Sequence, residues 1–260
     1  MKKTLKKIVA VLVLACCCAA MLAACGEEEV KVTSDGLWQY TLATDGTVTL
    51  DKYLGQAAEV VVPDKITIDG TDHAVAKLGD AAFMKIDDGS SRWRDRETYT
   101  SNKVLTKVTV SEGIKSIGNM TFYLCSALTR VDLPESLTSI GDFAFFGCSA
   151  LTEITFPKAV KNIGAYSFRA CSALTTVNVL AEGTLPDLGD KAFYLVDENA
   201  SGDDQYYISP SLKFFVPEQS LSLYNVDAIE EERRETKLNN HRYWSEYINA
   251  KCFPQLNAAQ

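Results

Sequence analysis

The sequence predicts an α/β solenoid: a right-handed coil, mostly β with short helical or 3-10 turns, in which turns of 23 residues stack on one another. Leucines recur at a constant interval of 23 residues, at Leu105, Leu128, Leu151 and Leu174. The lines Leu105–Ala127, Leu128–Ala150 and Leu151–Ala173 align without a gap, so glycine, phenylalanine and cysteine keep the same interval. A period of about 20 to 29 residues is the signature of a solenoid whose turns bury their apolar side chains only against neighbouring turns.

Each turn is expected to point three groups of apolar side chains inward. In the second line these are Leu128, Val131 and Leu133 on a short strand, then Leu137 and Ile140, then Phe145 and Cys148. Gly141, between the last two groups, permits a sharp corner where a side chain would cost steric strain. Because neighbouring strands lie about 4.8 Å apart, equivalent side chains of successive turns form columns.

The three lines share the pattern L-T-x-Φ-x-Φ-P-x-x-Φ-x-x-I-G-x-x-x-F-x-x-C-S-x, where Φ is an apolar residue. This pattern resembles the BspA-type leucine-rich-repeat family, a group of bacterial surface proteins. The match is close over residues 105–173, looser on both sides, and covers most of the chain after residue 37. The resemblance implies a single leucine-rich-repeat domain that binds other proteins or mediates adhesion at a cell surface.

This domain, residues 37–260, divides into three predicted parts. Residues 37–104 form an N-terminal cap and a first degenerate turn, residues 105–180 form the regular repeats, and residues 181–260 form an irregular turn and a C-terminal cap. A solenoid needs such caps because its terminal turns otherwise expose their apolar side chains.

The N-terminal part contains a hairpin signal and an insertion. Alternating apolar residues surround Asp45-Gly46, which predicts a β-hairpin, and Val75–Phe83 repeats the glycine–phenylalanine line of the regular turns. Sixteen extra residues lie between Phe83 and Leu105, within 84–104. Trp93, flanked there by two arginines, has the character of an interface anchor. The alternative is a solvated loop whose tryptophan folds back onto the coil.

The C-terminal part becomes irregular after the fourth leucine. Leu185–Phe193 restores the glycine–phenylalanine line, and the acidic spacing of the polar loop Asp197–Gln205 fits no EF-hand. Lys213–Pro217 reads as the last strand. The closing cap of the family is resembled by Tyr224 and Tyr243-Trp244. The charged stretch 228–242 lies between them and is absent from the shorter family pattern. It is either a helix or a flexible excursion of the chain.

The first 24 residues have the plan of a lipoprotein signal peptide. Four lysines precede an apolar run from Ile8 to Ala24, which is typical of a secretion signal; the run is also close to the minimum length of a membrane anchor. Leu22–Gly26 resembles a bacterial lipobox, which implies that Cys25 is lipidated and anchors the chain to a membrane. Residues 25–36 form an acidic tether, either a solvated spacer or similar to a surface-export signal.

Charge and cysteine usage exclude several classes of partner. Without the leader the chain has 22 basic and 34 acidic residues, a net charge of −12, so we expect no nucleic-acid binding. Four cysteines remain beside Cys25: Cys125, Cys148, Cys171 and Cys252. Their even number and the stacking of turns leave disulfides open, but recurrence once per turn favours a ladder of buried thiols. The two histidines are far apart in the sequence, which argues against a cysteine–histidine metal site, and we expect no metal and no cofactor.

No catalytic motif is present. The chain lacks a GxSxG elbow, a P-loop, an HExxH helix and a GxGxxG loop. Paired carboxylates of a hydrolase remain a weak alternative, because nothing singles out two of the 34 acids. We therefore predict that the protein is not an enzyme.

The variable positions of the repeat identify a candidate binding surface. Aromatic and basic residues follow the glycine or stand beside the core phenylalanine: Tyr123, Phe143, Phe146, Tyr166, Arg169 and Tyr194. Together with Trp93 they form the candidate set, because exposed apolar patches mark interaction sites. The alternative, which we weigh equally, is that these rings are half-buried between successive turns.

These observations predict an exported, lipid-anchored module of the bacterial cell envelope or surface. We expect it to be a monomer that binds a host or envelope protein. The alternative is a structural spacer, or a cell-wall or glycan-binding protein without a specific protein partner.

Overall fold

The computed structural model describes residues 30–86, 99–182, 185–197, 199, 206–218 and 220. The chain divides into two compact units, Met1–Lys31 and Val32–Gln260, and the account below concerns the second. Several predictions fall on residues outside the described part: Cys25, Trp93, Cys252, Tyr224, Tyr243-Trp244 and the charged stretch 228–242. Within the described ranges, no helix is long and apolar enough to cross a membrane.

The described chain consists of strands joined by tight turns. The first strands are β1 (Lys31–Val32), β2 (Trp38–Leu42), β3 (Val48–Tyr53), β4 (Glu59–Val62), β5 (Lys65–Ile68), β6 (Thr71–Leu78), β7 (Lys85–Ile86) and β8 (Tyr99–Thr100). The repeats contain β9 (Lys107–Val110), β10 (Ser116–Ile117), β11 (Arg130–Asp132), β12 (Ser139–Ile140), β13 (Glu153–Phe156), β14 (Asn162–Ile163), β15 (Thr176–Val179) and β16 (Asp187–Leu188). The last are β17 (Tyr194–Val196), β18 (Tyr206–Ile208) and β19 (Lys213–Phe215).

These residues contain no α-helix, so the α component of the predicted α/β fold is not found among them. The segment around Phe145 shows the physical reason. Phe143 and Gly147 have φ angles of +56° and +71°, and a left-handed residue interrupts a right-handed helix before it can complete a turn. The fold of the described part is mostly β.

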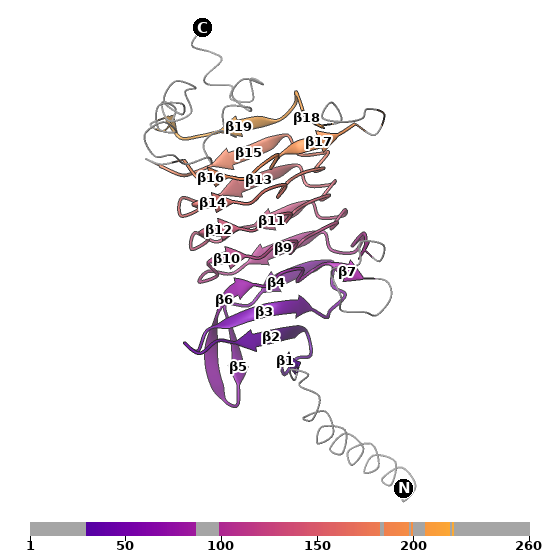
Figure 1. Ribbon diagram of the computed structural model, residues 1–260. Coiled ribbons are helices and arrows are strands. Elements are labelled where there is room, and N and C mark those ends of the chain that lie inside the picture. Colours follow the sequence, from indigo (N-terminus) through magenta and orange to yellow (C-terminus); the bar gives the residue numbers. More distant parts are fainter. Residues whose placement is uncertain are drawn as a thin grey trace, which may run out of the picture. The chain divides into compact units, whose positions relative to one another are not determined.

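The β6, β10, β12, β14 and β16 strands form one parallel ladder. Ser116 pairs with Ser139, and Ser139 pairs with Asn162, so residues 23 positions apart lie side by side. A second set of parallel strands rises beside it, with β4, β9 and β11 in one sheet and β13, β15 and β19 in another. In Figure 1 the strands of this second set lie one above the other from β4 to β19.

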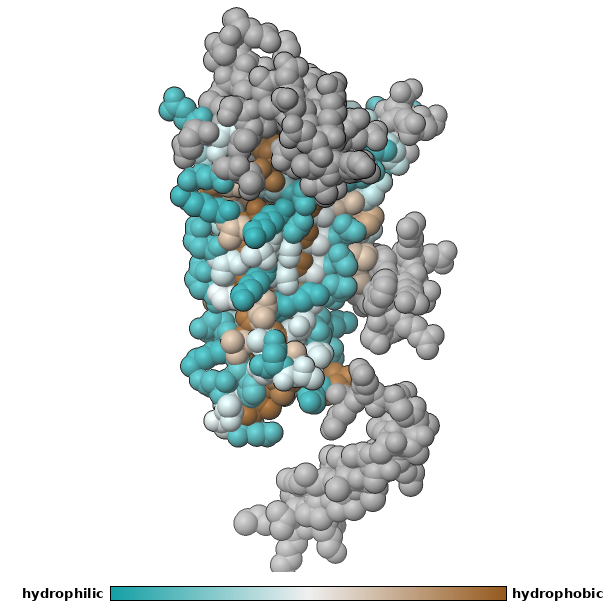
Figure 2. Space-filling model, turned by 60° about the vertical axis from the view of Figure 1, so that its left-hand side comes forward, coloured by the Kyte–Doolittle hydropathy of each residue, from teal (hydrophilic) through white to brown (hydrophobic). Residues whose placement is uncertain are grey.

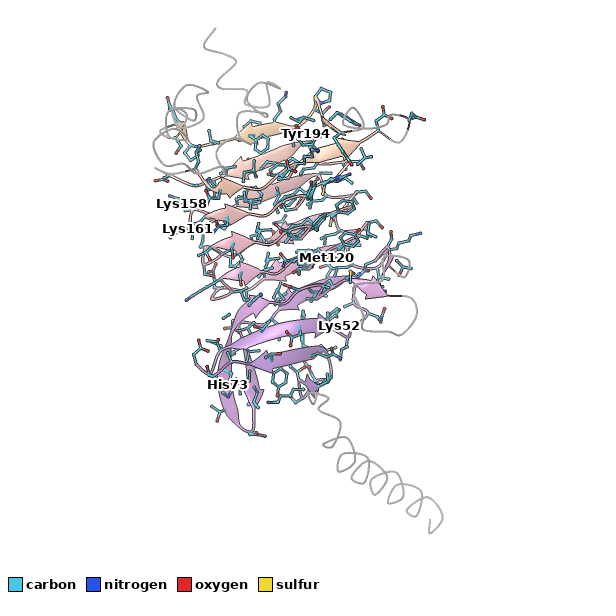
Figure 3. All side chains as sticks on the ribbon, in the orientation of Figure 1. Lys52, His73, Met120, Lys158, Lys161 and Tyr194 are labelled. Atoms are coloured by element: carbon cyan, nitrogen blue, oxygen red, sulfur yellow. The ribbon has the colours of Figure 1, made fainter. Side chains whose placement is uncertain are left out.

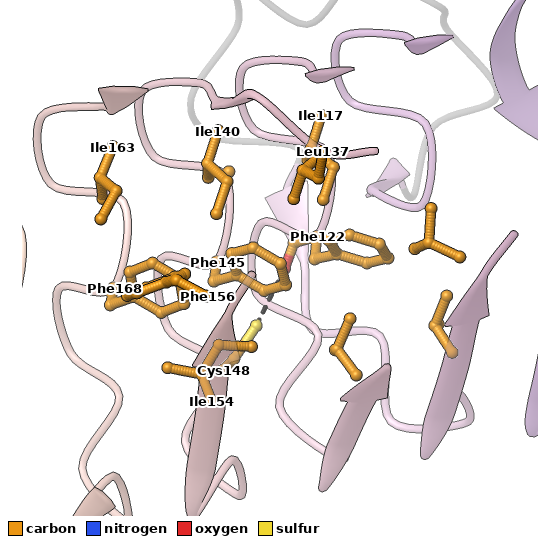
Figure 4. Close-up of a cluster of buried hydrophobic side chains, with 14 of the residues drawn as sticks. Ile117, Phe122, Leu137, Ile140, Phe145, Cys148, Ile154, Phe156, Ile163 and Phe168 are labelled. Atoms are coloured by element: carbon orange, nitrogen blue, oxygen red, sulfur yellow. Dashed lines mark hydrogen bonds between the residues drawn. The ribbon is translucent and has the colours of Figure 1, made fainter. Parts of the chain in front are cut away.

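The core is a set of side-chain columns, as predicted. Rings of successive turns stack with centroids 4.9 Å apart for Phe122 and Phe145 and 4.8 Å apart for Phe145 and Phe168. The column continues to Phe83 at one end and to Phe193 at the other. Figure 4 shows this row of rings beneath a parallel row of isoleucines: Ile117, Ile140 and Ile163. All of these side chains are buried, which confirms the predicted inward face.

Gly141 is required for a different reason from the one predicted. Its φ is not positive; a Cβ at this position would instead lie 2.7 Å from the carbonyl carbon of Gly118 and from the backbone nitrogen of Asn119. The glycine therefore lets two successive turns approach each other. The left-handed corner comes two residues later, at Met120, Phe143 and the equivalent positions of other turns.

The recurring cysteines are buried thiols. The Cys148 thiol donates to the Phe122 carbonyl oxygen at 3.2 Å, a bond drawn in Figure 4, and the Cys171 thiol donates to the Phe145 carbonyl at 3.1 Å. Burial raises the pKa of Cys125 and Cys171 to about 12. The three cysteines of the repeats are free, which confirms the prediction for them, and such protonated, buried thiols are poor nucleophiles.

Antiparallel hairpins lie on both sides of the repeats. The predicted hairpin β2–β3 turns at Asp45-Gly46, where the Asp45 carboxylate accepts the Thr47 N–H at 2.9 Å. A second hairpin, β5–β6, turns at Asp69-Gly70, where both residues have positive φ. After the repeats, β17 pairs with β18, a hairpin that the irregular sequence did not predict.

Candidate binding surface

Two columns of variable residues run along one edge of the coil. One column follows the glycine of each turn and the other lies beside the core phenylalanine. Figure 3 shows Met120 and Tyr194, which belong to these columns, on one edge of the coil, and Lys158 and Lys161 on the opposite edge. The repeat therefore gathers the predicted residues on one side because each keeps its place in the turn.

The predicted rings stack on one another across turns. Tyr123 and Phe146 lie 5.0 Å apart with their planes at 13°, and Phe143 and Tyr166 lie 5.0 Å apart at 20°. Phe143 and Phe146 join the two columns, with centroids 6.0 Å apart. All four rings are half-buried. The rings therefore pack between successive turns, as the alternative expected, and their role as a binding surface stays a prediction.

The backbone beneath these rings is strained. Met120, Phe143 and Tyr166 have φ angles of +55°, +56° and +55°. A left-handed conformation costs a residue with a side chain about 1–2 kcal/mol. Hydrogen bonds to the next turn hold it in place: the Phe143 N–H donates to the Ala165 carbonyl, and the Tyr166 N–H donates to the Asp190 carbonyl. Because Ala81 and Lys191 have positive φ at the same place in their turns, the left-handed residue is the corner that the repeat requires.

Arg169 lies at the centre of an aromatic cluster. Its guanidinium carbon is 4.3 Å from the ring centroid of Tyr206, 5.3 Å from that of Tyr166 and 5.8 Å from that of Phe146. Its Nε is buried and donates to no acceptor in the described part of the chain. Lys191 lies 4.4 Å from the same Tyr206 ring. Two cations thus share one ring, and among the described residues the guanidinium is held by ring faces rather than by a carboxylate.

Tyr166 is fixed at its polar end. Its hydroxyl donates to Oδ2 of Asp190 at 2.9 Å, and this bond raises the pKa of Tyr166. The hydroxyl therefore stays protonated and keeps the ring in position beside Arg169.

We define the aromatic strip by the residues that these contacts connect: Tyr123, Phe143, Phe146, Tyr166, Arg169 and Tyr206. Of the predicted set, Tyr194 lies on β17, half-buried against the hydrophobic core, and Trp93 falls outside the described residues. Sequence analysis missed Tyr206 and Lys191. Lys191 has the same position after the glycine as Tyr166, whereas Tyr206 comes from β18, outside the repeat.

The described residues offer no metal centre. No group of three histidine, cysteine, aspartate or glutamate side chains is arranged there to hold a metal ion.

The surface over much of the coil is polar. Figure 2 shows one side of the molecule, where hydrophilic side chains dominate and apolar atoms appear in narrow bands between them.

Comparison with known proteins identifies the family. Residues 95–199 match the family described as BspA type leucine rich repeat region, in six copies. A leucine-rich repeat protein from Bacteroides capillosus ATCC 29799 is 31% identical, over 60% of this chain and 100% of that one, with a TM-score of 0.48. The chain belongs to the BspA-type leucine-rich-repeat family, whose members are typically non-enzymatic binding modules.

Two further solved structures show the same type of repeat. The T. pallidum leucine rich repeat protein TpLRR is 28% identical, over 63% of this chain and 66% of that one, with a TM-score of 0.48. A leucine rich cell surface protein from Faecalibacterium prausnitzii A2-165 is 21% identical, over 70% of this chain and 61% of that one, with a TM-score of 0.42. The chain thus spans about two thirds of these two proteins. No curated protein matches it.

Proposed function

We propose that this chain is a lipid-anchored module of the bacterial cell surface that binds another protein through the aromatic strip. The observation that carries the proposal is the cluster around Arg169, in which a guanidinium without a carboxylate partner among the described residues lies against three rings. Tyrosine and arginine, together with well-packed apolar neighbours, are the residues that carry most of the energy in protein–protein interfaces.

The geometry of the rings favours a protein over a glycan. A sugar binds an aromatic side chain through the flat face of the ring. Here the faces of Tyr123 and Phe146, and those of Phe143 and Tyr166, are turned toward each other at about 5 Å. Those paired faces are not open to a sugar, whereas the Arg169 guanidinium beside the rings suits the mixed surface of a protein. The glycan-binding and spacer functions remain the second candidates.

The surface location rests on the sequence and on the relatives. The lipobox-like segment Leu22–Gly26 supports lipidation of Cys25, and the relative from F. prausnitzii is a cell surface protein by its description. Intact mass and detergent partitioning of the native protein test this part. The measured mass should equal that of a lipidated chain whose first residue is Cys25. A Cys25→Ala variant that stays in the detergent phase would contradict the anchor.

We infer further that the coil is right-handed with turns of 23 residues, and that its ends are closed by caps. The pairing of Ser116 with Ser139 and of Ser139 with Asn162 supports the turn length. The β2–β3 hairpin supports the N-terminal cap, because Trp38 of this hairpin packs 5.4 Å from Phe83, the first ring of the phenylalanine column.

The binding proposal is tested by capture from host and envelope extracts with the chain lacking its leader. The double variant Phe146→Ser, Tyr166→Ser removes two rings of the strip and should abolish capture while the far-UV spectrum is kept. Lys161→Ser, an exposed position on the opposite edge of the coil (Figure 3), is the matched control and should leave capture intact. Capture that survives the double variant would exclude the strip as the site.

A further inference from the structure

Arg169 and Lys191 carry positive charges that no acid of the described chain balances. Neither residue takes part in the ion pairs formed among the described residues. The Nε of Arg169 is buried and has no acceptor in this part of the chain. The chain without its leader is nevertheless strongly acidic, so these two cations stand out from the charge of the whole.

The two cations lie close together because they share the ring of Tyr206. The guanidinium carbon of Arg169 is 4.3 Å from the ring centroid and Nζ of Lys191 is 4.4 Å from it, which limits how far apart the charges can be. Like charges at such a separation repel each other, because the Debye length in physiological salt is about 8 Å. A ring face attracts a cation but is only a weak acceptor for its N–H groups. An anion bound beside both cations would remove the repulsion and supply the missing acceptor.

The acids next to the strip in the sequence are engaged in other contacts. Asp190 precedes Lys191, and its Oδ2 accepts the hydroxyl of Tyr166 at 2.9 Å. Asp142 precedes Phe143, and its Oδ1 accepts the N–H of Ala165 at 2.7 Å. Neither carboxylate forms an ion pair with a cation of the described chain. The anion must therefore come from elsewhere.

The chemistry of the two cations favours a carboxylate with an apolar neighbour. A guanidinium presents a planar fork of N–H donors that matches a carboxylate, and an ammonium adds a compact charge. Apolar rings begin directly beside these cations. The Phe146 ring lies 5.8 Å from the guanidinium carbon of Arg169, and the Phe143 ring lies 6.0 Å from that of Phe146. Charged and apolar contacts in one row suit a peptide better than a bare ion.

We propose that the aromatic strip recognises an acidic segment of its partner protein. A glutamate or aspartate carboxylate of the partner binds beside Arg169 and Lys191, and an apolar side chain next to it packs on Phe143 and Phe146. This inference rests on the function proposed above, because it names the partner chemistry of the same strip.

Three capped peptides separate charge from shape. They have the sequence acetyl-Gly-X-Phe-X-Leu-Gly-amide, in which X is glutamate, glutamine or lysine. The leaderless chain is titrated with each peptide while the NMR signals of the Tyr206 ring and the Lys191 side chain are followed. The glutamate peptide should shift these signals saturably, the glutamine peptide should bind at least about fivefold more weakly, and the lysine peptide should not bind. Raising the salt to about 0.5 M should weaken the glutamate peptide most, because salt screens charge pairs.

Two substitutions of Lys191 form a matched pair. Lys191→Gln removes the charge and should lower the affinity for the glutamate peptide toward that for the glutamine peptide. Lys191→Arg keeps the charge and should retain the preference. Lys161→Gln, at an exposed position on the opposite edge of the coil (Figure 3), should change neither affinity.

Several results would overturn the proposal. They are equal binding of the glutamate and glutamine peptides, no shift by the glutamate peptide at about 1 mM, and an unchanged preference in Lys191→Gln. Binding that appears only in the double variant Asp203→Asn, Asp204→Asn would overturn it as well. In that case the acids that come shortly before Tyr206 in the sequence would be the occupants of the cations.

The function proposed above fails on a different result, which is partner capture that survives the double variant Phe146→Ser, Tyr166→Ser. Capture that is lost in this double variant but kept in Lys191→Gln would leave the strip as the binding site. Together with equal binding of the glutamate and glutamine peptides, it would show that the partner is not recognised by its acids.

Discussion

Phe145 stacks on Phe168 with ring centroids 4.8 Å apart and planes at 9°, although 23 residues separate the two in the chain. This spacing equals the distance between neighbouring strands of a sheet. The repeat period, the strand register and the ring spacing therefore have one cause: each 23-residue turn rises by the distance between two neighbouring strands. The same step that stacks the buried phenylalanines also stacks the rings of the aromatic strip on the surface.

Replacing Phe145 with alanine should destabilise the coil strongly, because it interrupts a fully buried column. Loss of a buried phenylalanine costs about 3–5 kcal/mol, which a thermal or urea melt will show. Phe146→Ala is the matched control: its side chain is half-buried on the strip and should cost much less. Equal losses for the two variants would contradict the assignment of inward and outward faces.

Ile140→Asp should unfold the repeats. The side chain is buried in the isoleucine column, and a carboxylate there would lie without a partner, at a cost of several kcal/mol. Ser139→Asp, on the same strand but half-exposed, is the comparison variant. A melting curve of the Ile140 variant that matches the parent would show that this residue does not face the core.

Gly141→Ala should cost more than Gly113→Ala. The added Cβ at Gly141 meets the backbone of the preceding turn at 2.7 Å, so two turns must move apart. At Gly113 the φ of +93° strains a side chain but no atom lies within 4 Å of the added Cβ. Overpacking costs about 1–3 kcal/mol, in addition to any conformational strain. Urea midpoints in the reverse order would indicate that the turns do not approach each other at Gly141.

The buried thiols predict a pH dependence of stability. Burial raises the pKa of Cys125 and Cys171 from 9.0 to about 12, so their protonated forms favour the folded state. This contribution is fully present below pH 9 and is lost as the pH rises from 9 to 12. The melting temperature should fall more steeply over this range in the parent than in a Cys125→Ala, Cys171→Ala variant. Parallel profiles, or rapid alkylation of Cys125 or Cys171 in the folded chain at about pH 8, would contradict the burial.

Arg169→Gln should weaken partner capture with little effect on folding. The glutamine removes the cation that the rings of Tyr166 and Tyr206 surround, a contribution of about 0.5–2 kcal/mol. Tyr206→Ser should act in the same direction. Lys158→Gln, at an exposed position on the opposite edge, serves as the charge-matched comparison. Unchanged capture by the Arg169 variant would remove the residue from the binding site.

Sequence periodicity predicts what repeats and little else. Phe122, Phe145 and Cys148 were placed inward because residues one period apart face the same way. Tyr206 was missed because it belongs to a hairpin that has no counterpart in other turns. Arg130 and Glu153, one period apart, also suggest a cross-strand ion pair, but Arg130 bonds Asp132 and Glu153 accepts from Asn178.

The reason why a glycine recurs at the position of Gly141 could not be predicted from one turn alone. Its role depends on the distance to Gly118 in the preceding turn, which is a property of the stack. The residue that turns the chain with a left-handed backbone is Phe143. A positive φ is uncommon for a bulky residue, so the residue type did not predict it.

The most direct test of the columns is the set of nuclear Overhauser contacts between phenylalanine rings in the leaderless chain. With rings centred 4.8–4.9 Å apart, protons of Phe145 should show cross-peaks to both Phe122 and Phe168, while Phe122 and Phe168 should show none to each other. Absence of the Phe145 cross-peaks, or a direct contact between Phe122 and Phe168, would contradict the stacked coil on which the binding surface rests.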